Sequence, residues 1–257
     1  MQIKNWTAYL GDCLEIMKTI PDGSIDAIIT DPPYWTTACK WDSVIPFEPM
    51  WEQLKRIIKP NGAIVLFGSE PFSSALRMSN IKMYKYDWIW EKHKWTGHLL
   101  AKKQPLKSHE IISVFWNTIN YYPQMREWKK YNAERKTIWD GVWWKDSNTV
   151  MTINKWDRYP ITNLYFPYSS KKDKFHPTQK PVALIEYLIK TYSLEGETVL
   201  DFTAGSFTTA VACENTNRKW ICIEQDLWYC KIWANRINEN RIKLWLDILD
   251  FTSILEK

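Results

Sequence analysis

The sequence predicts an α/β fold with a mostly parallel sheet, and three features support this prediction. Short apolar runs of strand character alternate with longer helical patterns along most of the chain. Runs such as SIDAIIT, at residues 24–30, are largely apolar rather than alternating, which is typical of parallel strands buried on both faces. Hydrophobic residues make up 45 % of the 257 residues, enough for the core of one large domain or of a domain with an inserted module.

In the first half of the chain, the expected elements end at turn residues. They are a strand at residues 7–12, a helix at 13–20, the strand at 24–30, a helix at 46–62, a strand at 63–68, a helix at 71–80, and strands at 86–92 and 110–117. Pro21-Asp22-Gly23 ends the first helix and Pro60-Asn61-Gly62 the second, because proline and glycine interrupt helical structure. The second helix would carry Trp51, Leu54 and Ile58 on one face.

Regular alternation returns in the last third of the chain. The expected elements there are a helix at residues 181–193, a strand at 197–202, a helix at 208–217, a strand at 219–226 and a helix at 227–246. Between the two regular parts, the periodicity fades over residues 117–170, which are rich in Trp, Tyr, Lys and Arg. We interpret this stretch as an inserted module.

Charge and cysteine content limit the class of protein. The formal charge is +5, and residues 92–109 hold five lysines, three of the four histidines and no acid. Such a run is compatible with nucleic acid but is also typical of a solvated face, so both interpretations stay open. The five cysteines are Cys13, Cys39, Cys213, Cys222 and Cys230. An odd number without a C-x-x-C pair argues for a reducing compartment and against a disulfide frame or a metal site.

The N-terminal residues do not resemble a targeting segment. MQIKNWTAYLGD lacks an apolar core segment, and no apolar run elsewhere is long enough to span a bilayer. We therefore expect a soluble, intracellular protein.

Four of the predicted strands end at acidic residues, and ligands of open parallel sheets bind outside those ends. These residues are Asp12, Asp31, Asp201 and Glu224. The stretch DFTAGSFTT leads from a strand into a helix, the setting of a nucleotide-binding turn, and Glu224 follows at about the spacing of a carboxylate that binds ribose hydroxyls. Because Gly205 is the only one of the usual glycines, an ordinary strand–helix turn stays open as the alternative.

The strand at residues 24–30 ends in the motif Asp31-Pro32-Pro33-Tyr34. The Asp31 carboxylate and the Pro32 carbonyl are both acceptors, and the prolines hold the turn rigid. The ring of Tyr34 offers a stacking face. Two acceptors and an aromatic plate suit a nucleobase with an exocyclic amino group, whereas a plain turn would explain the prolines alone.

The ordered set of motifs resembles the amino-group DNA methyltransferases that use S-adenosylmethionine, in the order in which DPPY precedes the cofactor motif. The match runs through GDCLEIMKTIPDGSIDAIITDPPY, KPNGAIVLFGS, HPTQKPVALIEYLIKTYS, VLDFTAGS and ICIEQD. The resemblance implies a Rossmann-like sheet, mostly parallel with an antiparallel strand. It also implies a catalytic half at residues 1–116, a target-recognition module at 117–170 and a cofactor-binding half at 171–257.

The resemblance further implies roles at matching positions. Asp31 and Pro32, in a turn with Pro33, would hold the amino nitrogen, and Tyr34 would stack on the flipped-out base. Asp12 and Cys13 would lie against the adenine of the cofactor, and Glu224 would hold its ribose. The residues around the rest of the cofactor would be Asp31, Lys180, Asp201, Phe202, Thr203, Ala204, Gly205, Ser206 and Thr208. His176 of the HPTQKP segment is either a contact or a structural histidine.

The same resemblance bears on the target base. Cytosine carbon-5 methylation needs a cysteine nucleophile, usually in a Pro-Cys pair, and no such pair occurs here. Asp at the first motif position favours N6 of adenine, with S-adenosylhomocysteine as the second product. Cytosine N4 is the alternative target, although enzymes that act on it more often have Ser at that position.

Double-stranded DNA is the partner that the resemblance implies. The lysines of the basic run, Lys92, Lys94, Lys102, Lys103 and Lys107, would meet phosphates. Arg126, Arg135 and Arg158 of the module would read guanine edges or contact phosphates. We expect no membrane partner. We expect a cytoplasmic protein that is encoded by a bacterium, an archaeon or a phage. A homodimer and a cognate restriction endonuclease stay open as further partners.

Two residues depart from the pattern. Phe207 replaces the second glycine of a Gly-Ser-Gly motif, where its side chain would crowd the methionine moiety. Trp35 follows DPPY where a small residue is frequent. These departures keep a catalytically weakened, DNA-binding relative open as an alternative, whereas methylation of RNA or a small molecule fits the basic, aromatic insert less well. We expect two further tryptophans, Trp95 and Trp220, in the core.

Overall fold

The computed structural model describes residues 6–34, 43–116, 120–127, 131–136, 149–154, 157–167 and 179–252. Trp35 and His176 lie outside these ranges. The chain divides into two compact units, one formed by Met1–Tyr122 with Thr162–Lys257 and the other by Pro123–Ile161. Within the described ranges, no helix has the length and apolar character needed to cross a membrane.

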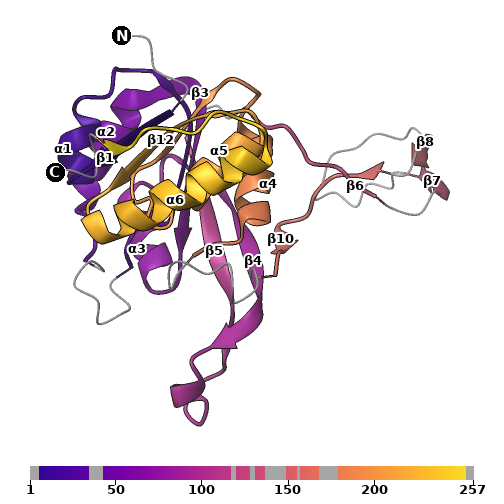
Figure 1. The fold of residues 1–257 in the computed structure, drawn as a ribbon. Coiled ribbons are helices and arrows are strands. Elements are labelled where there is room, and N and C mark those ends of the chain that lie inside the picture. The colour runs from indigo at the N-terminus through magenta and orange to yellow at the C-terminus, as the bar shows by residue number, and fades with distance from the viewer. Residues whose placement is uncertain are drawn as a thin grey trace. The chain divides into compact units, whose positions relative to one another are not determined.

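The larger unit is built on an eight-stranded sheet (Figure 1). In spatial order its strands are β1 (Trp6–Leu10), β12 (Lys219–Glu224), β11 (Thr198–Asp201), β2 (Ile25–Thr30), β3 (Ile58–Gly68), β5 (Lys107–Phe115), β4 (Tyr84–Thr96) and β10 (Asn163–Tyr165). Only β5 runs against its neighbours, β3 and β4, and every other adjacent pair is parallel. The predicted α/β sheet, mostly parallel with an antiparallel strand, is confirmed.

Helices cover both faces of this sheet (Figure 1). The helices on one face are α1 (Cys13–Met17), α2 (Phe47–Ile57) and α3 (Phe72–Ser79), and those on the other are α4 (Val182–Tyr192), α5 (Thr208–Asn215) and α6 (Leu227–Lys243). Alternate strand residues therefore serve separate cores: Ile28 and Ile64 pack with the first set, Ile29 and Val65 with the second. This two-sided burial explains why the central strands are apolar without alternation.

The second predicted helix ends earlier than expected. Helix α2 stops at Ile57, and Ile58 begins β3 opposite Ile25, so the expected place of Ile58 on the helix was wrong. Pairing in the sheet buries Ile58 and outweighs the helical periodicity. The chain then passes close to the neighbouring strand, since a Cβ on Gly62 would lie 2.8 Å from the carbonyl oxygen of Asp26.

The smaller unit contains two antiparallel pairs. Strand β6 (Arg126–Glu127) pairs with β9 (Asp157–Arg158), and β7 (Tyr131–Lys136) pairs with β8 (Thr149–Asn154). Its bounds are narrower than the expected 117–170, because both flanks are tied to the larger unit. The Tyr122 amide donates to the Thr191 carbonyl oxygen at 2.9 Å, and β10 joins the sheet beside β4.

The two further tryptophans have opposite environments. Trp220 is fully buried, as expected, whereas Trp95 is 57 % exposed, so its expected place in the core was wrong. Trp95 lies near the tip of the β4–β5 hairpin, which extends beyond the rest of the sheet (Figure 1) and includes a short 3-10 helix, η1 (His98–Leu100). Residues 93–100 around it are exposed as well, so Trp95 lies outside both hydrophobic cores.

Candidate functional site

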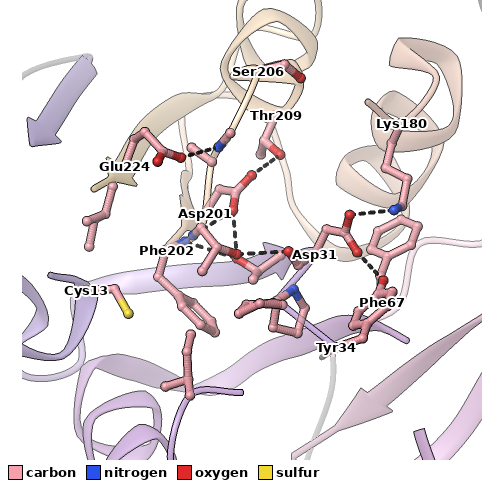
Figure 2. A pocket seen from close by; sticks show the side chains of 18 of the residues that line it. Cys13, Asp31, Tyr34, Phe67, Lys180, Asp201, Phe202, Ser206, Thr209 and Glu224 are labelled. Carbon is pink, nitrogen blue, oxygen red and sulfur yellow. Dashed lines mark hydrogen bonds and ion pairs between the residues drawn. The ribbon is translucent and has the colours of Figure 1, made fainter. Parts of the chain in front are cut away.

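A cavity of about 630 Å³ lies at the carboxyl ends of the parallel strands, within the larger unit (Figure 2). Every site residue expected from the sequence lines it: Asp12, Cys13, Asp31, Pro32, Pro33, Tyr34, Lys180, Asp201, Phe202, Thr203, Ala204, Gly205, Ser206, Thr208 and Glu224. The structure thus brings together segments from both halves of the chain, because β2 lies directly beside β11.

Glu224, the last residue of β12, anchors the turn after β11. Its Oε2 accepts a hydrogen bond from the Gly205 amide at 2.7 Å, and its Oε1 accepts one from the Asp226 amide at 2.9 Å. Gly205 has a φ of 51°, a left-handed conformation that favours glycine. Burial raises the pKa of Glu224. Because each carboxylate oxygen has a second lone pair, Glu224 can still accept hydroxyl donors from a ligand.

Asp201 ties the same turn to the end of β2. Its Oδ1 accepts from the Thr30 hydroxyl at 2.8 Å and from the Thr203 amide at 3.2 Å, and its Oδ2 accepts from the Thr209 hydroxyl at 2.6 Å. Burial raises the pKa of Asp201 to about 6. The sequence interpretation missed Thr30 and Thr209, whose hydroxyls occupy both oxygens of this carboxylate. A contact of Asp201 with the cofactor stays a prediction.

Asp12 and Cys13 form another wall of the cavity, at the start of α1. Asp12 Oδ1 accepts from the amides of Leu14 at 2.8 Å and Glu15 at 3.1 Å, and so caps the helix. Burial, with the nearby Asp12 carboxylate, raises the pKa of Cys13 to about 12. The Cys13 thiol is therefore protonated at neutral pH and serves as a small apolar surface rather than a nucleophile.

Asp31, directly after β2, is held through both oxygens. The Tyr34 hydroxyl donates to its Oδ1 and the Lys180 ammonium donates to its Oδ2 (Figure 2). The Thr203 hydroxyl donates to its backbone carbonyl at 3.1 Å. Burial raises the pKa of Asp31, although Lys180 favours the ionised form. The sequence motif suggested a stacking role for the Tyr34 ring, and the structure adds a hydrogen bond from its hydroxyl.

Two further charged residues, Glu110 and Lys92, reach the site from the antiparallel part of the sheet. Lys180 Nζ lies 3.2 Å from Glu110 Oε2, and Lys92 Nζ donates to Glu110 Oε1 at 3.3 Å. Burial acts to raise the pKa of Glu110, but Lys180 and Lys92 together hold it below its usual value. The expected phosphate contact of Lys92 was wrong: Lys92 is 4 % exposed and, like Trp88 and Trp90, faces inward by strand alternation.

Glu110 lies near the start of its strand, whereas the sequence motifs point to acids that follow the ends of parallel strands, so the sequence did not indicate Glu110. Strand β5 is antiparallel, so its first residues lie beside the carboxyl end of β3, with Ile111 opposite Gly68. The available signal was an acid at the start of the otherwise apolar run EIISVF.

Phe207 points away from the cavity. It is fully buried, it stacks on Trp233 with 4.0 Å between ring centroids, and its ring meets Trp220 edge-on. Its φ of 56° is left-handed. This backbone conformation turns the side chain into the core between the sheet and α6, so the expected crowding of the methionine moiety was wrong.

Comparison with known proteins gives one family for most of the chain. The family model N6_N4_Mtase, described as DNA methylase, matches residues 25–235. The Type II methyltransferase M2.MboI of Moraxella bovis is 26 % identical over 263 residues, covering 92 % of this chain and 89 % of that protein. The Type II methyltransferase M.HpaI of Haemophilus parainfluenzae is 27 % identical over 240 residues, covering 88 % of this chain and 72 % of that protein.

Solved structures share the fold. The M1.HpyAVI–SAM complex superposes with a TM-score of 0.62 at 23 % identity, covering 91 % of this chain and 99 % of that one. PvuII DNA methyltransferase, described as cytosine-N4-specific, superposes with a TM-score of 0.64 at 18 % identity, covering 95 % of this chain and 93 % of that one.

Proposed function

Because the chain belongs to the DNA methylase family of S-adenosylmethionine-dependent amino-methyltransferases, we propose that it methylates the N6 amino group of an adenine flipped out of duplex DNA. The observation that carries this proposal is the place of Asp31-Pro32-Pro33-Tyr34. The motif lines the same cavity as Glu224 and the turn at residues 201–208. A base held at Asp31 would therefore lie beside a nucleoside-like cofactor held at Glu224.

The cavity fits the cofactor by the chemistry of its walls. Glu224 offers buried acceptors for ribose hydroxyls, and Asp12 with Cys13 forms a wall for the adenine. The turn at residues 201–208, with Lys180, would surround the methionine end. When bound, S-adenosylmethionine supplies an electrophilic methyl group.

In the proposed mechanism, Asp31 acts on the amino group of the base. An exocyclic amine is a weak nucleophile because its lone pair is delocalised into the ring. Hydrogen bonds from its N–H groups to Asp31 and to the Pro32 carbonyl favour a nitrogen with an available lone pair. Positive charge grows on that nitrogen during the transfer, and the adjacent Asp31 carboxylate stabilises it. As S-adenosylhomocysteine forms, the nitrogen releases one of its two protons along the hydrogen bond to Asp31, which restores a neutral amine. Rotation of the nucleotide out of the duplex costs a few kcal/mol, which DNA contacts offset.

The choice of adenine rests on Asp31. Asp at the first position of this motif favours adenine N6, whereas Ser is commoner in enzymes that act on cytosine N4. Cytosine N4 is the second candidate, and the fold shared with PvuII DNA methyltransferase is compatible with it. The alternative of a catalytically weakened relative is less well supported, because it rested partly on Phe207, which lies outside the cavity.

Labelled S-adenosylmethionine and unmodified bacterial DNA test this proposal. The protein is incubated with both, the DNA is digested to nucleosides, and the products are analysed by mass spectrometry. We expect N6-methyladenine. N4-methylcytosine would show that the target base is cytosine and that the proposed mechanism acts on its N4 amino group. DNA binding without any methylated nucleoside would contradict the proposed activity and favour the weakened relative.

Glu224→Ala should weaken cofactor binding by about 10- to 100-fold, because charge-assisted hydrogen bonds contribute on the order of 1.5–3 kcal/mol. Isothermal titration with S-adenosylhomocysteine measures the change without requiring activity. Glu239→Ala, which removes an exposed acid from α6, is the matched control and should keep the native dissociation constant. An unchanged constant for folded Glu224→Ala would remove this residue from the ribose site.

Lys102→Ala/Lys103→Ala should weaken DNA binding several-fold at low salt. Both lysines are exposed in the loop of the β4–β5 hairpin, and Thr96 and Lys107, which flank this loop, line the cavity. If each meets a phosphate, the slope of log K against log salt should become shallower by about two units. Lys231→Ala/Lys243→Ala removes the same charge from α6 and should keep the native slope. Equal slopes for both double variants would rule out the hairpin contact.

A further inference from the structure

Four charged side chains form a chain of alternating sign beside the DPPY motif. In order they are Asp31, Lys180, Glu110 and Lys92, and each lies within ion-pair distance of the next. The side chains of Lys180, Glu110 and Lys92 are 7 %, 13 % and 4 % exposed. Burying charges so deeply is costly unless each is compensated, so such a chain at a reactive carboxylate calls for a functional reason.

The proposed reaction makes a demand that the observed arrangement does not meet. Asp31 must accept a hydrogen bond from the amino group of the base, yet its oxygens receive the Tyr34 hydroxyl and the Lys180 ammonium. Each Asp31 oxygen keeps a second lone pair, but an ammonium on Oδ2 opposes the positive charge that grows on the amino nitrogen. Asp31 therefore stabilises that charge best when Lys180 turns to another anionic partner, which a buried ammonium needs.

Glu110 offers that partner. Its Oε1 accepts from Lys92, whereas its Oε2 is buried and receives no hydrogen bond from the described residues, although it lies 3.2 Å from Lys180 Nζ. Lys180 Nζ also lies 5.2 Å from the ring centroid of Phe67 and 5.9 Å from that of Tyr34, so aromatic faces flank the ammonium. A small rotation of Lys180 would complete a hydrogen bond to Glu110.

We propose that Glu110 is a positioning residue that takes over the Lys180 ammonium when Asp31 engages the amino group of the base. Lys92 holds Glu110 in place from the other side and keeps it ionised. The exchange leaves the net charge of the buried cluster unchanged and frees Asp31 Oδ2. This inference rests on the proposed function, because it assigns a task to the same site.

Glu110→Gln tests the exchange, because it keeps the shape and removes the charge that attracts Lys180. Single-turnover methyl incorporation is measured with labelled S-adenosylmethionine and unmodified bacterial DNA. We expect a rate at least about tenfold lower, with cofactor and DNA dissociation constants within about twofold of native. Glu91→Gln, an exposed acid on β4, is the matched control and should keep the native rate.

A second variant separates this role from a structural one. Glu110→Gln/Lys92→Met removes both charges, so the cluster keeps its charge balance and the thermal stability should approach that of the native protein. Because the alternative partner for Lys180 is still missing, the slow methyl transfer should persist. A double variant as fast as native would show that Glu110 only neutralises Lys92, and would overturn the proposal.

The pH profile gives a further readout. The groups facing Asp31 are Lys180, Glu110 and the Tyr34 hydroxyl, with Asp201 nearby. The Glu110 charge raises the pKa of Asp31, so in Glu110→Gln the acidic limb of the rate should shift to lower pH while the maximum falls. An unchanged rate and an unchanged acidic limb would overturn the exchange and leave the proposed methylation standing. No methylation by the native protein would overturn the proposed function, and the exchange with it.

Discussion

Asp31→Ala should lower the rate of methyl transfer by about 10²- to 10³-fold while leaving cofactor affinity nearly unchanged, the scale seen when one preorganised group is removed from a transition state. The expected cause is the loss of the acceptor that stabilises positive charge on the amino nitrogen. The fold should persist, because Lys180 keeps Glu110 as an ion-pair partner and Thr203 keeps its bond to the backbone at residue 31. Single-turnover kinetics and titration with S-adenosylhomocysteine measure the two effects separately.

Asp31→Asn is the matched variant, because it keeps the shape and removes the charge. It should be nearly as slow as Asp31→Ala if the charge matters, whereas near-normal turnover in either variant would contradict the role. The proposed mechanism uses Asp31 in its ionised form, and burial raises the pKa of Asp31. The native rate should therefore fall as the pH drops through that raised value, above the range usual for a carboxyl group.

Phe207→Gly should lower the free energy of unfolding by about 3 kcal/mol, with cofactor affinity unchanged in the folded protein. Truncation of a buried Phe typically costs about 3–5 kcal/mol, and here it removes the stack on Trp233. Glycine offsets part of this loss of stability, because it adopts the left-handed backbone conformation of position 207 without the strain of a Cβ. Urea unfolding and isothermal titration measure the two quantities.

Phe207→Leu is the control for lost packing, since it keeps an apolar side chain and the strained backbone. We expect a smaller loss of stability than in the glycine variant and the same affinity for S-adenosylhomocysteine. Tighter cofactor binding by Phe207→Gly without a loss of stability would show that the side chain borders the ligand after all.

The sequence alone was enough to predict the order of elements outside residues 117–170, the sheet class and the segments that line the cavity. Motifs at strand ends carry this information locally, because a buried parallel strand is apolar along its length and its ligand-binding residues follow directly after it. Asp31, Asp201 and Glu224 were found in this way, and the pairing of β2 with β11 places them around one cavity.

Other features were decided by tertiary structure. Glu110 begins its strand instead of ending it, and only the antiparallel pairing of β5 brings it to Lys180. Lys92 belongs to a basic run, yet the pleat of β4 turns it inward, while the backbone at Phe207 turns that side chain away from the cavity. Strand direction, pleat and backbone handedness depend on which neighbour an element meets, and residue order along the chain does not specify that neighbour.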